Sequence, residues 1–220
     1  MTRFVLATVV ASTLASAASA SFTGYSVERV ISAAGNTRYS VYANFSANNL
    51  VFLNAFSFVN SAGSLAMNAR HQDFLTADGE VGTWQAGSSV SATDRPEDSW
   101  VTASGLATSA GWGSALDPGF ANGGIVRDIN AGAGWYDATP GTANPIQAGG
   151  TQGGYRILLA QIVRTGDDSG YVSNHSMQLA WKVAGTTTAI FGNGSFQIGV
   201  PAPGAMALLG LAGLAGRRRR

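Results

Sequence analysis

Few side chains in this sequence belong to the types that carry out chemistry. The two histidines, His71 and His175, lie in polar surroundings and neither has a partner at i, i+4 for a metal. We therefore expect both at the surface. The chain has no cysteine, which excludes disulfides, thiolate metal sites and cysteine nucleophiles. Gly-x-Ser-x-Gly, Walker and His-Glu-x-x-His motifs are also missing, so the sequence predicts a protein that is not an enzyme.

Carboxylates form the second candidate group. Calcium takes clustered carboxylate oxygens, and the tight acidic groups that could bind it are Asp94, Glu97 and Asp98, followed by Asp167 and Asp168. Neither group matches the Asp-x-Asp-x-Asp-Gly loop, and Arg95 opposes a cation in the first, so hydrogen-bonded turn residues are the main interpretation. A carboxylate pair for glycoside hydrolysis, drawn from Asp94, Glu97 and Asp98 or from Asp73, Asp78 and Glu80, is a less favoured alternative.

Aromatic side chains in loop-like surroundings are the third group. Sugar rings stack on exposed aromatic faces while nearby amides bind the hydroxyls. The candidate carbohydrate contacts are Trp84, Trp112, Trp135 and Tyr136. The main interpretation, however, is that these side chains cover the core beneath a glycine-rich segment, residues 105 to 154. Trp181, by contrast, is expected in the core.

Length and composition indicate one domain with a substantial core. The chain has 220 residues, of which 45% are hydrophobic and 11% charged. The net charge of +1 is unevenly distributed along the chain, because five of the thirteen basic residues lie near the termini, at Arg3 and Arg217 to Arg220. The rest of the chain has eight basic and twelve acidic residues, so its net charge is negative. We therefore expect no nucleic-acid partner.

The N-terminus has the pattern of a secretory signal peptide. Arg3 precedes an apolar run from Phe4 to Ala11, and small residues follow at Ala18 and Ala20. Cleavage after Ala20 would leave Ser21 as the first residue of an exported protein.

The C-terminus has the pattern of a membrane anchor. Pro201, Ala202, Pro203 and Gly204 precede an apolar stretch, residues 205 to 216, and then the cations Arg217, Arg218, Arg219 and Arg220. The stretch is shorter than the roughly 20 residues of a usual spanning helix. The positive-inside preference would leave the arginines in the cytoplasm and the body outside the inner membrane.

These three components in this order resemble the PEP-CTERM sorting signal, in its Pro-Ala-Pro form from planctomycete-type exported proteins. Ala202 stands where the name-giving motif has Glu. The resemblance implies a sorting protease of the exosortase type as a partner and a cell-envelope or extracellular location. The body is similar to other exported proteins of this group at Tyr39 to Phe45, Asp98 to Thr102 and Gly134 to Tyr136, a likeness that implies no known activity.

Alternation of apolar and polar residues with period two predicts strands throughout the body. The expected strands are 25–31, 37–45, 50–59, 100–103, 125–129, 155–164, 176–183 and 196–200. Segment 155–164 is apolar on both faces and should be central. In segment 50–59, the side chains of Phe52, Phe56 and Phe58 should share one face.

The predicted fold is all-β, a two-sheet β-sandwich or jelly roll, flanked by an N-terminal signal helix and a C-terminal hydrophobic helix. The expected units are the signal peptide 1–20, the β-sandwich domain 21–199 and the sorting and anchor segment 200–220. We expect an exported structural or adhesive protein. A carbohydrate-binding module for extracellular polysaccharide is the alternative, and a glycosidase or other hydrolase is the less favoured one. No cofactor is expected, apart from the candidate calcium.

Overall fold

A computed structural model describes residues 21–72, 82–85, 95–105, 114–120, 127–137, 147–148, 154–166 and 168–199. The predicted signal peptide and the sorting segment lie outside the described residues. Within the described part of the chain, no helix is long and apolar enough to cross a membrane.

The fold is all-β. The described residues form ten strands and the short 3-10 helix Arg95–Glu97. The strands are β1 Phe22–Ile31, β2 Thr37–Phe45, β3 Leu50–Asn60, β4 Trp100–Gly105, β5 Ser114–Leu116, β6 Trp135–Asp137, β7 Gln147–Ala148, β8 Tyr155–Arg164, β9 Val172–Val183 and β10 Ala189–Gly199.

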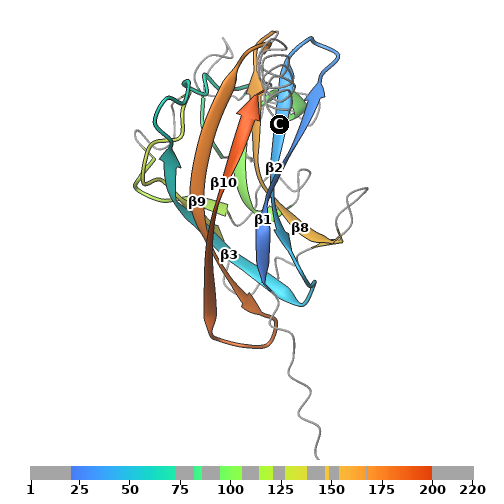
Figure 1. Ribbon diagram of the computed structural model, residues 1–220, viewed down its shortest axis with the longest axis vertical. Coiled ribbons are helices and arrows are strands. Elements are labelled where there is room, and N and C mark those ends of the chain that lie inside the picture. The colour runs from blue at the N-terminus through green and yellow to red at the C-terminus, as the bar shows by residue number, and fades with distance from the viewer. Residues whose placement is uncertain are drawn as a thin grey trace, which may run out of the picture.

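These strands make two antiparallel, five-stranded sheets (Figure 1). Sheet A has the order β1-β2-β8-β4, with β7 paired to β8, and sheet B has the order β10-β9-β3-β6-β5. The inward side chains of both sheets form one shared core. This arrangement is compatible with the predicted β-sandwich.

Period-two alternation is confirmed in the long strands. In β2, alternate residues from Thr37 to Phe45 are buried and those between them are half-buried. In β9, Met177, Leu179 and Trp181 point into the core. Strand β8 is buried on both faces and lies between β2 and β4, as its continuous apolar run predicts.

Strand β3 departs from simple alternation. Phe52 and Phe58 are buried as predicted, but Phe56 is only half-buried, and Ala55 occupies the core position instead. The cause is two shifts in the β3–β9 register, one between Phe52 and Asn54 and one between Phe56 and Val59. Each irregularity reverses the inward and outward sides, so the expected common face for the three phenylalanines was wrong.

The expected strand at 125–129 was also wrong in its described part, 127–129, which forms bends and irregular backbone. Ala69 N donates to Arg127 O, and the Asp128 carboxylate accepts from the backbone amides of Met67 and Asn68. The Asp128 side chain therefore accepts hydrogen bonds from backbone amides that a neighbouring strand would bind in a ladder. Phe120 and Trp135 are buried, which confirms that the glycine-rich segment has aromatic residues that cover the core.

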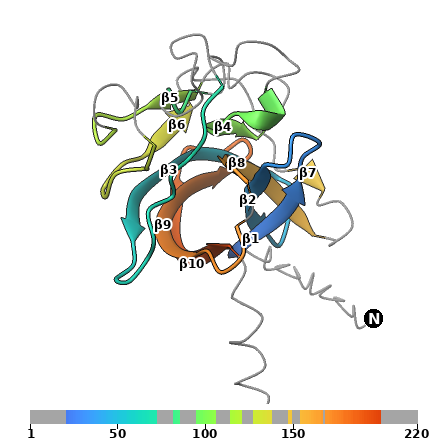
Figure 2. The ribbon, with the colours of Figure 1, turned by 90° about the horizontal axis from the view of Figure 1, so that it is seen from above.

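The two sheets converge where β1 lies alongside β10 (Figure 2). Rings of Phe22 and Tyr25 from β1 occupy this seam, and Tyr25 OH donates to Met177 O at 3.0 Å. There is room for these two rings because the inward positions of β10 include Gly192 and Gly194, which have no side chain. A Cβ on Gly192 would lie 2.9 Å from the Trp181 ring, and one on Gly194 would lie 3.0 Å from the Tyr25 ring.

We predict that Gly192→Val destabilises the domain by about 1–3 kcal/mol, because its side chain would displace the Trp181 and Phe22 rings. The control is Gln197→Val on the same strand, where the native side chain is exposed. Urea unfolding of both variants checks the prediction. Equal free energies of unfolding for the two variants would contradict it.

Candidate ligand-binding face

The outer face of sheet B is the candidate site. In β10, the inward residues alternate with exposed ones, which leaves Phe191, Asn193 and Ser195 facing outward. In β9, the same alternation turns Ser176 and Gln178 outward.

Strand pairing aligns these side chains in rows across the sheet. Phe191 of β10 is opposite Ala180 of β9, Ala180 is opposite Asn54 of β3, and Asn54 is opposite Tyr136 of β6. Each of the four precedes or follows an inward core residue, so all four belong to the outer face. We call this set the aromatic row.

Two phenylalanines meet on this face. Phe191 is 66% exposed, more than any other large apolar side chain among the described residues, and its ring lies 6.3 Å from that of Phe56 at 88°. The strand between them presents Ala180, whose small side chain leaves room for the edge-to-face pair. The irregularities in β3 that turn Phe56 outward therefore build this pair.

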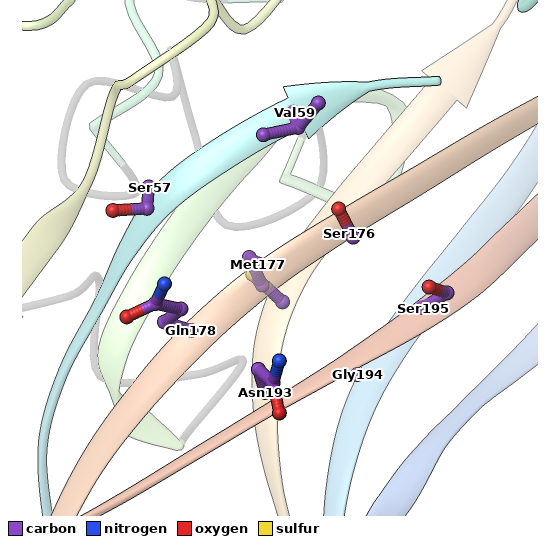
Figure 3. A pocket seen from close by; sticks show the side chains of 8 residues that line it. All are labelled: Ser57, Val59, Ser176, Met177, Gln178, Asn193, Gly194 and Ser195. Carbon is purple, nitrogen blue, oxygen red and sulfur yellow. The ribbon is translucent and has the colours of Figure 1, made fainter. Parts of the chain in front are cut away.

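Beside the phenylalanines lies an open hollow of about 290 Å³ (Figure 3). Its lining is mostly polar and comprises Ser57, Val59, Ser176, Met177, Gln178, Asn193, Gly194 and Ser195. Asn193 and Gln178 are opposite each other in the β9–β10 ladder. Ser57 has φ 53°, a rare backbone conformation for a residue other than glycine.

The face is nearly free of charge. Among the described residues of sheet B, the charged side chains are Lys182 of β9 and the half-buried Asp137 of β6. Asp137 lies on the same side of its strand as the inward Trp135, two residues before it. No residue that lines the hollow carries an acid or a base. The arrangement can stack on a flat apolar surface and exchange hydrogen bonds with hydroxyl or amide groups.

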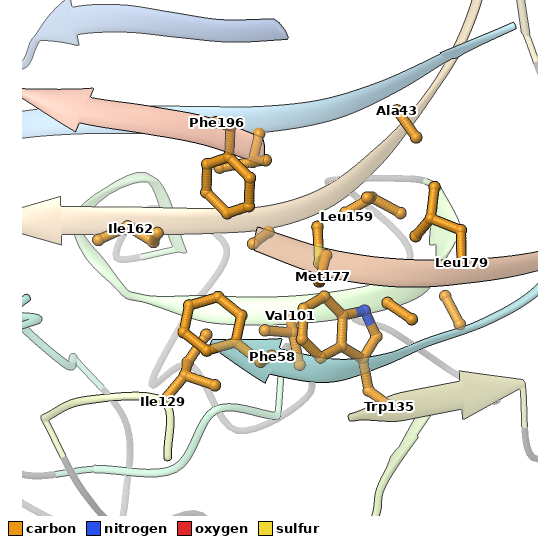
Figure 4. Packing of buried hydrophobic residues seen from close by; sticks show 14 of the residues in the cluster. Ala43, Phe58, Val101, Ile129, Trp135, Leu159, Ile162, Met177, Leu179 and Phe196 are labelled. Carbon is orange, nitrogen blue, oxygen red and sulfur yellow. The ribbon is translucent and has the colours of Figure 1, made fainter. Parts of the chain in front are cut away.

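Two of the four predicted carbohydrate contacts are in the core. Trp84 is 0% exposed and Trp135 is 1% exposed, so neither ring can stack on a sugar. The candidate sugar contact was wrong for both, and the main interpretation, that these rings cover the core, is confirmed. Trp135 lies among core residues such as Val101 and Phe58 (Figure 4), and its Nε1 donates to Thr102 O at 3.1 Å.

The remaining two have different outcomes. Tyr136 is 42% exposed and belongs to the aromatic row, whereas Trp112 lies outside the described residues. Phe191 and Phe56 were missed by the sequence reasoning. Phe191 and Phe196 are five positions apart, so in one strand they face opposite sides, and this signal could have identified Phe191.

The described calcium candidates are each bound by other groups of the protein. Glu97 accepts from Asn36 Nδ2 at 2.7 Å, and Asp98 is fully buried and accepts from Gln72 N at 2.9 Å. Asp94 and Asp167 lie outside the described residues, as do Asp73, Asp78 and Glu80. No group of three potential metal ligands occurs among the residues that the structure describes.

Asp168, the remaining candidate, is buried in an ion pair with Arg29 and also accepts from Thr37 Oγ1 at 3.2 Å. Burial by itself would raise the pKa of the Asp168 carboxyl, but the bonds and charge of Arg29 outweigh it and lower that pKa. This carboxylate stabilises the link between β1 and the segment that precedes β9.

Both histidines are completely buried, so their expected surface location was wrong. The His71 ring packs edge-on against Trp84 at 5.1 Å, and its Nδ1 lies 3.6 Å from Asp98 Oδ1. His175 packs between Phe58 and Phe196, with ring centroids 5.2 and 5.4 Å away. Polar sequence neighbours did not reveal these partners, because the rings that pack on each histidine come from other segments of the chain.

Comparisons with protein-family models, curated proteins and solved structures give no match for this chain.

The environment of His175 predicts a pH-dependent stability. Its Nδ1 lies 2.8 Å from Asn60 Oδ1, and its Nε2 is buried without a hydrogen-bond partner among the described residues. Burial lowers the pKa of His175 from 6.5 to about 4. The folded protein therefore keeps this ring neutral at pH values where the unfolded chain protonates it, and stability falls as the pH decreases from 6.5 toward 4.

We expect wild type to lose about 2 kcal/mol more than His175→Gln between pH 7 and pH 4.5, because glutamine does not titrate. Urea unfolding of both proteins at the two pH values measures this difference in the free energy of unfolding. Contributions of the other titrating groups are common to both proteins and cancel in the comparison. Parallel pH dependences in the two proteins would show that His175 is not responsible.

Proposed function

We propose that this is an exported, non-enzymatic adhesive protein of the cell envelope or extracellular matrix, and that its domain binds polysaccharide through the outer face of sheet B. The observation that carries the proposal is the exposed Phe191 ring, paired with Phe56 beside a polar, uncharged hollow. Isolated exposed apolar residues are common, but an exposed ring that is paired with a second aromatic ring beside facing amides is typical of a ligand surface.

The chemistry of the face fits a sugar. The C–H face of a sugar ring packs on an aromatic ring, and its hydroxyls both donate and accept hydrogen bonds. The amides of Asn193 and Gln178 also donate and accept, as do the hydroxyls of Ser57, Ser176 and Ser195. The hollow is open, which suits a polymer chain that passes across it.

A hydrolytic role has less support. Glycoside hydrolysis requires two carboxyl groups at the scissile bond. Among the described residues of sheet B, Asp137 of β6 is the one carboxylate, and the described acidic residues considered above are bound by other protein groups. We therefore propose binding without catalysis.

The cellular address is proposed from the sequence. The signal peptide would export the chain, and the Pro201-Ala202-Pro203-Gly204 motif with Arg217 to Arg220 would present it to an exosortase-type protease at the inner membrane. Strand β10 ends at Gly199, so the sorting segment would begin directly at the end of a closed β-sandwich. The flanking signal and anchor helices of the predicted fold belong to this proposal.

The binding proposal is tested by retention of the full-length protein on polysaccharide prepared from the producing organism. We expect Phe191→Ala to weaken retention about two- to tenfold, the effect of losing one aromatic contact. Because Phe191 is largely exposed, the free energy of unfolding should change by less than about 1 kcal/mol.

The matched control is Gln197→Ala, which changes an exposed residue of the same strand outside the hollow. It should bind as wild type does. Absence of retention by the wild-type protein, with or without calcium, would reject polysaccharide binding and leave a purely structural role.

The sorting proposal has its own test. Replacing Arg217 to Arg220 with serine removes the charges that would hold the tail in the cytoplasm. We expect cell fractionation to show altered membrane retention of this variant. Unchanged distribution between membrane and extracellular fractions would count against a sorting tail.

A further inference from the structure

We infer that the ligand is an uncharged glycan chain that lies across the strands of sheet B, from Phe191 on β10 to Tyr136 on β6. This inference rests on the proposed function and names its ligand class and orientation. It depends on three features of the face: its row geometry, the distribution of aromatic residues and the lack of charge.

The row geometry sets the minimum length of the ligand. Phe191 and Tyr136 are at opposite ends of the aromatic row, with β9 and β3 between their strands. Three strand spacings separate them, about 14 Å. A ligand that contacts both rings must therefore be longer than a single sugar ring.

The distribution of aromatic residues sets the direction. Along β10, the outward positions are Ala189, Phe191, Asn193, Ser195 and Gln197, with one aromatic residue among them. Across the strands, by contrast, β10, β3 and β6 each contribute an outward aromatic ring. A chain along β10 would meet one aromatic ring. A chain across the strands would pass Phe191 and Tyr136 in the aromatic row, with Phe56 beside that row, opposite Gln178 and in contact with Phe191.

The lack of charge sets the ligand class. An acidic polysaccharide is bound most strongly by cationic donors, which make charge-assisted hydrogen bonds to its carboxylates. The lining of the hollow has no cation, and Lys182 is two residues along β9 from the aromatic row at Ala180. Neutral amides and hydroxyls match the hydroxyls of a neutral sugar without leaving a carboxylate unpaired.

The first experiment distinguishes ligand class. The full-length protein is run in affinity gels that contain hydroxyethylcellulose, galactomannan, xylan or dextran as neutral probes, or alginate or polygalacturonate as acidic ones. We expect retardation by at least one neutral polysaccharide, with little change between low and high salt.

Retardation by acidic polysaccharides alone, lost in high salt, would overturn this inference while leaving polysaccharide binding in place. Retardation by no probe, together with no retention on the native polysaccharide, would overturn both the inference and the proposed function.

The second experiment tests orientation with oligosaccharides of graded length, prepared from the neutral polysaccharide that binds. A disaccharide can contact the Phe191–Phe56 pair and the hollow, but cannot also reach Tyr136. We therefore expect Tyr136→Ala to weaken binding of the long oligosaccharides about two- to tenfold and leave the disaccharide unchanged, whereas Phe191→Ala weakens both.

Tyr136→Phe keeps the ring and should bind long oligosaccharides nearly as wild type does. Thermal unfolding of each variant separates loss of binding from loss of structure. Equal effects of Tyr136→Ala on short and long ligands, or no effect on either, would overturn the proposed direction.

Discussion

The closure of the two sheets against each other at β1 and β10 is the constraint on which the rest of this structure depends. A chain without cysteine must hold its sheets together by packing, and here the rings of Phe22, Tyr25 and Trp181 fill the seam. Large inward side chains on β10 would prevent this contact, so Gly192 and Gly194 stand there. With glycine inward at these positions, the neighbouring residues Phe191 and Asn193 are the ones left facing outward.

The outer faces of the two sheets differ in which side chains they expose. On sheet A, Trp100 and Leu158 are buried with Tyr42 in a cluster apart from the main core, and Arg156 forms an ion pair with Glu28 beside them. On sheet B, the corresponding surface exposes aromatic rings among amides and hydroxyls. Because the aromatic rings Trp100 and Tyr42 pack together on sheet A while Phe191 and Tyr136 are exposed on sheet B, we assign the proposed binding face to sheet B.

Buried polar groups form hydrogen bonds and ion pairs that hold the connecting segments against the sheets. Asp168 joins Arg29 and Thr37, while Asp98 accepts from the Gln72 amide. The Arg164 guanidinium stacks 3.5 Å from the Tyr171 ring centre and donates to the carbonyl of Met67. Such groups are costly to bury unless they are bonded, so they favour one arrangement of the connecting segments. Residues that suggested calcium binding thus act within the described structure as internal links.

The sequence by itself determined the all-β class, the alternation in β2 and β9 and the central position of β8, because period two and a continuous apolar run are properties of neighbouring residues. Only the tertiary structure decided which polar and aromatic residues are buried. Burial of His71, Trp84 and Trp135 depends on partners from distant segments, and the outward turn of Phe56 depends on the β3–β9 register. Tyr136 was predictable as a candidate contact, but its alignment with Phe191 arises from three strand pairings, which local spacing does not encode.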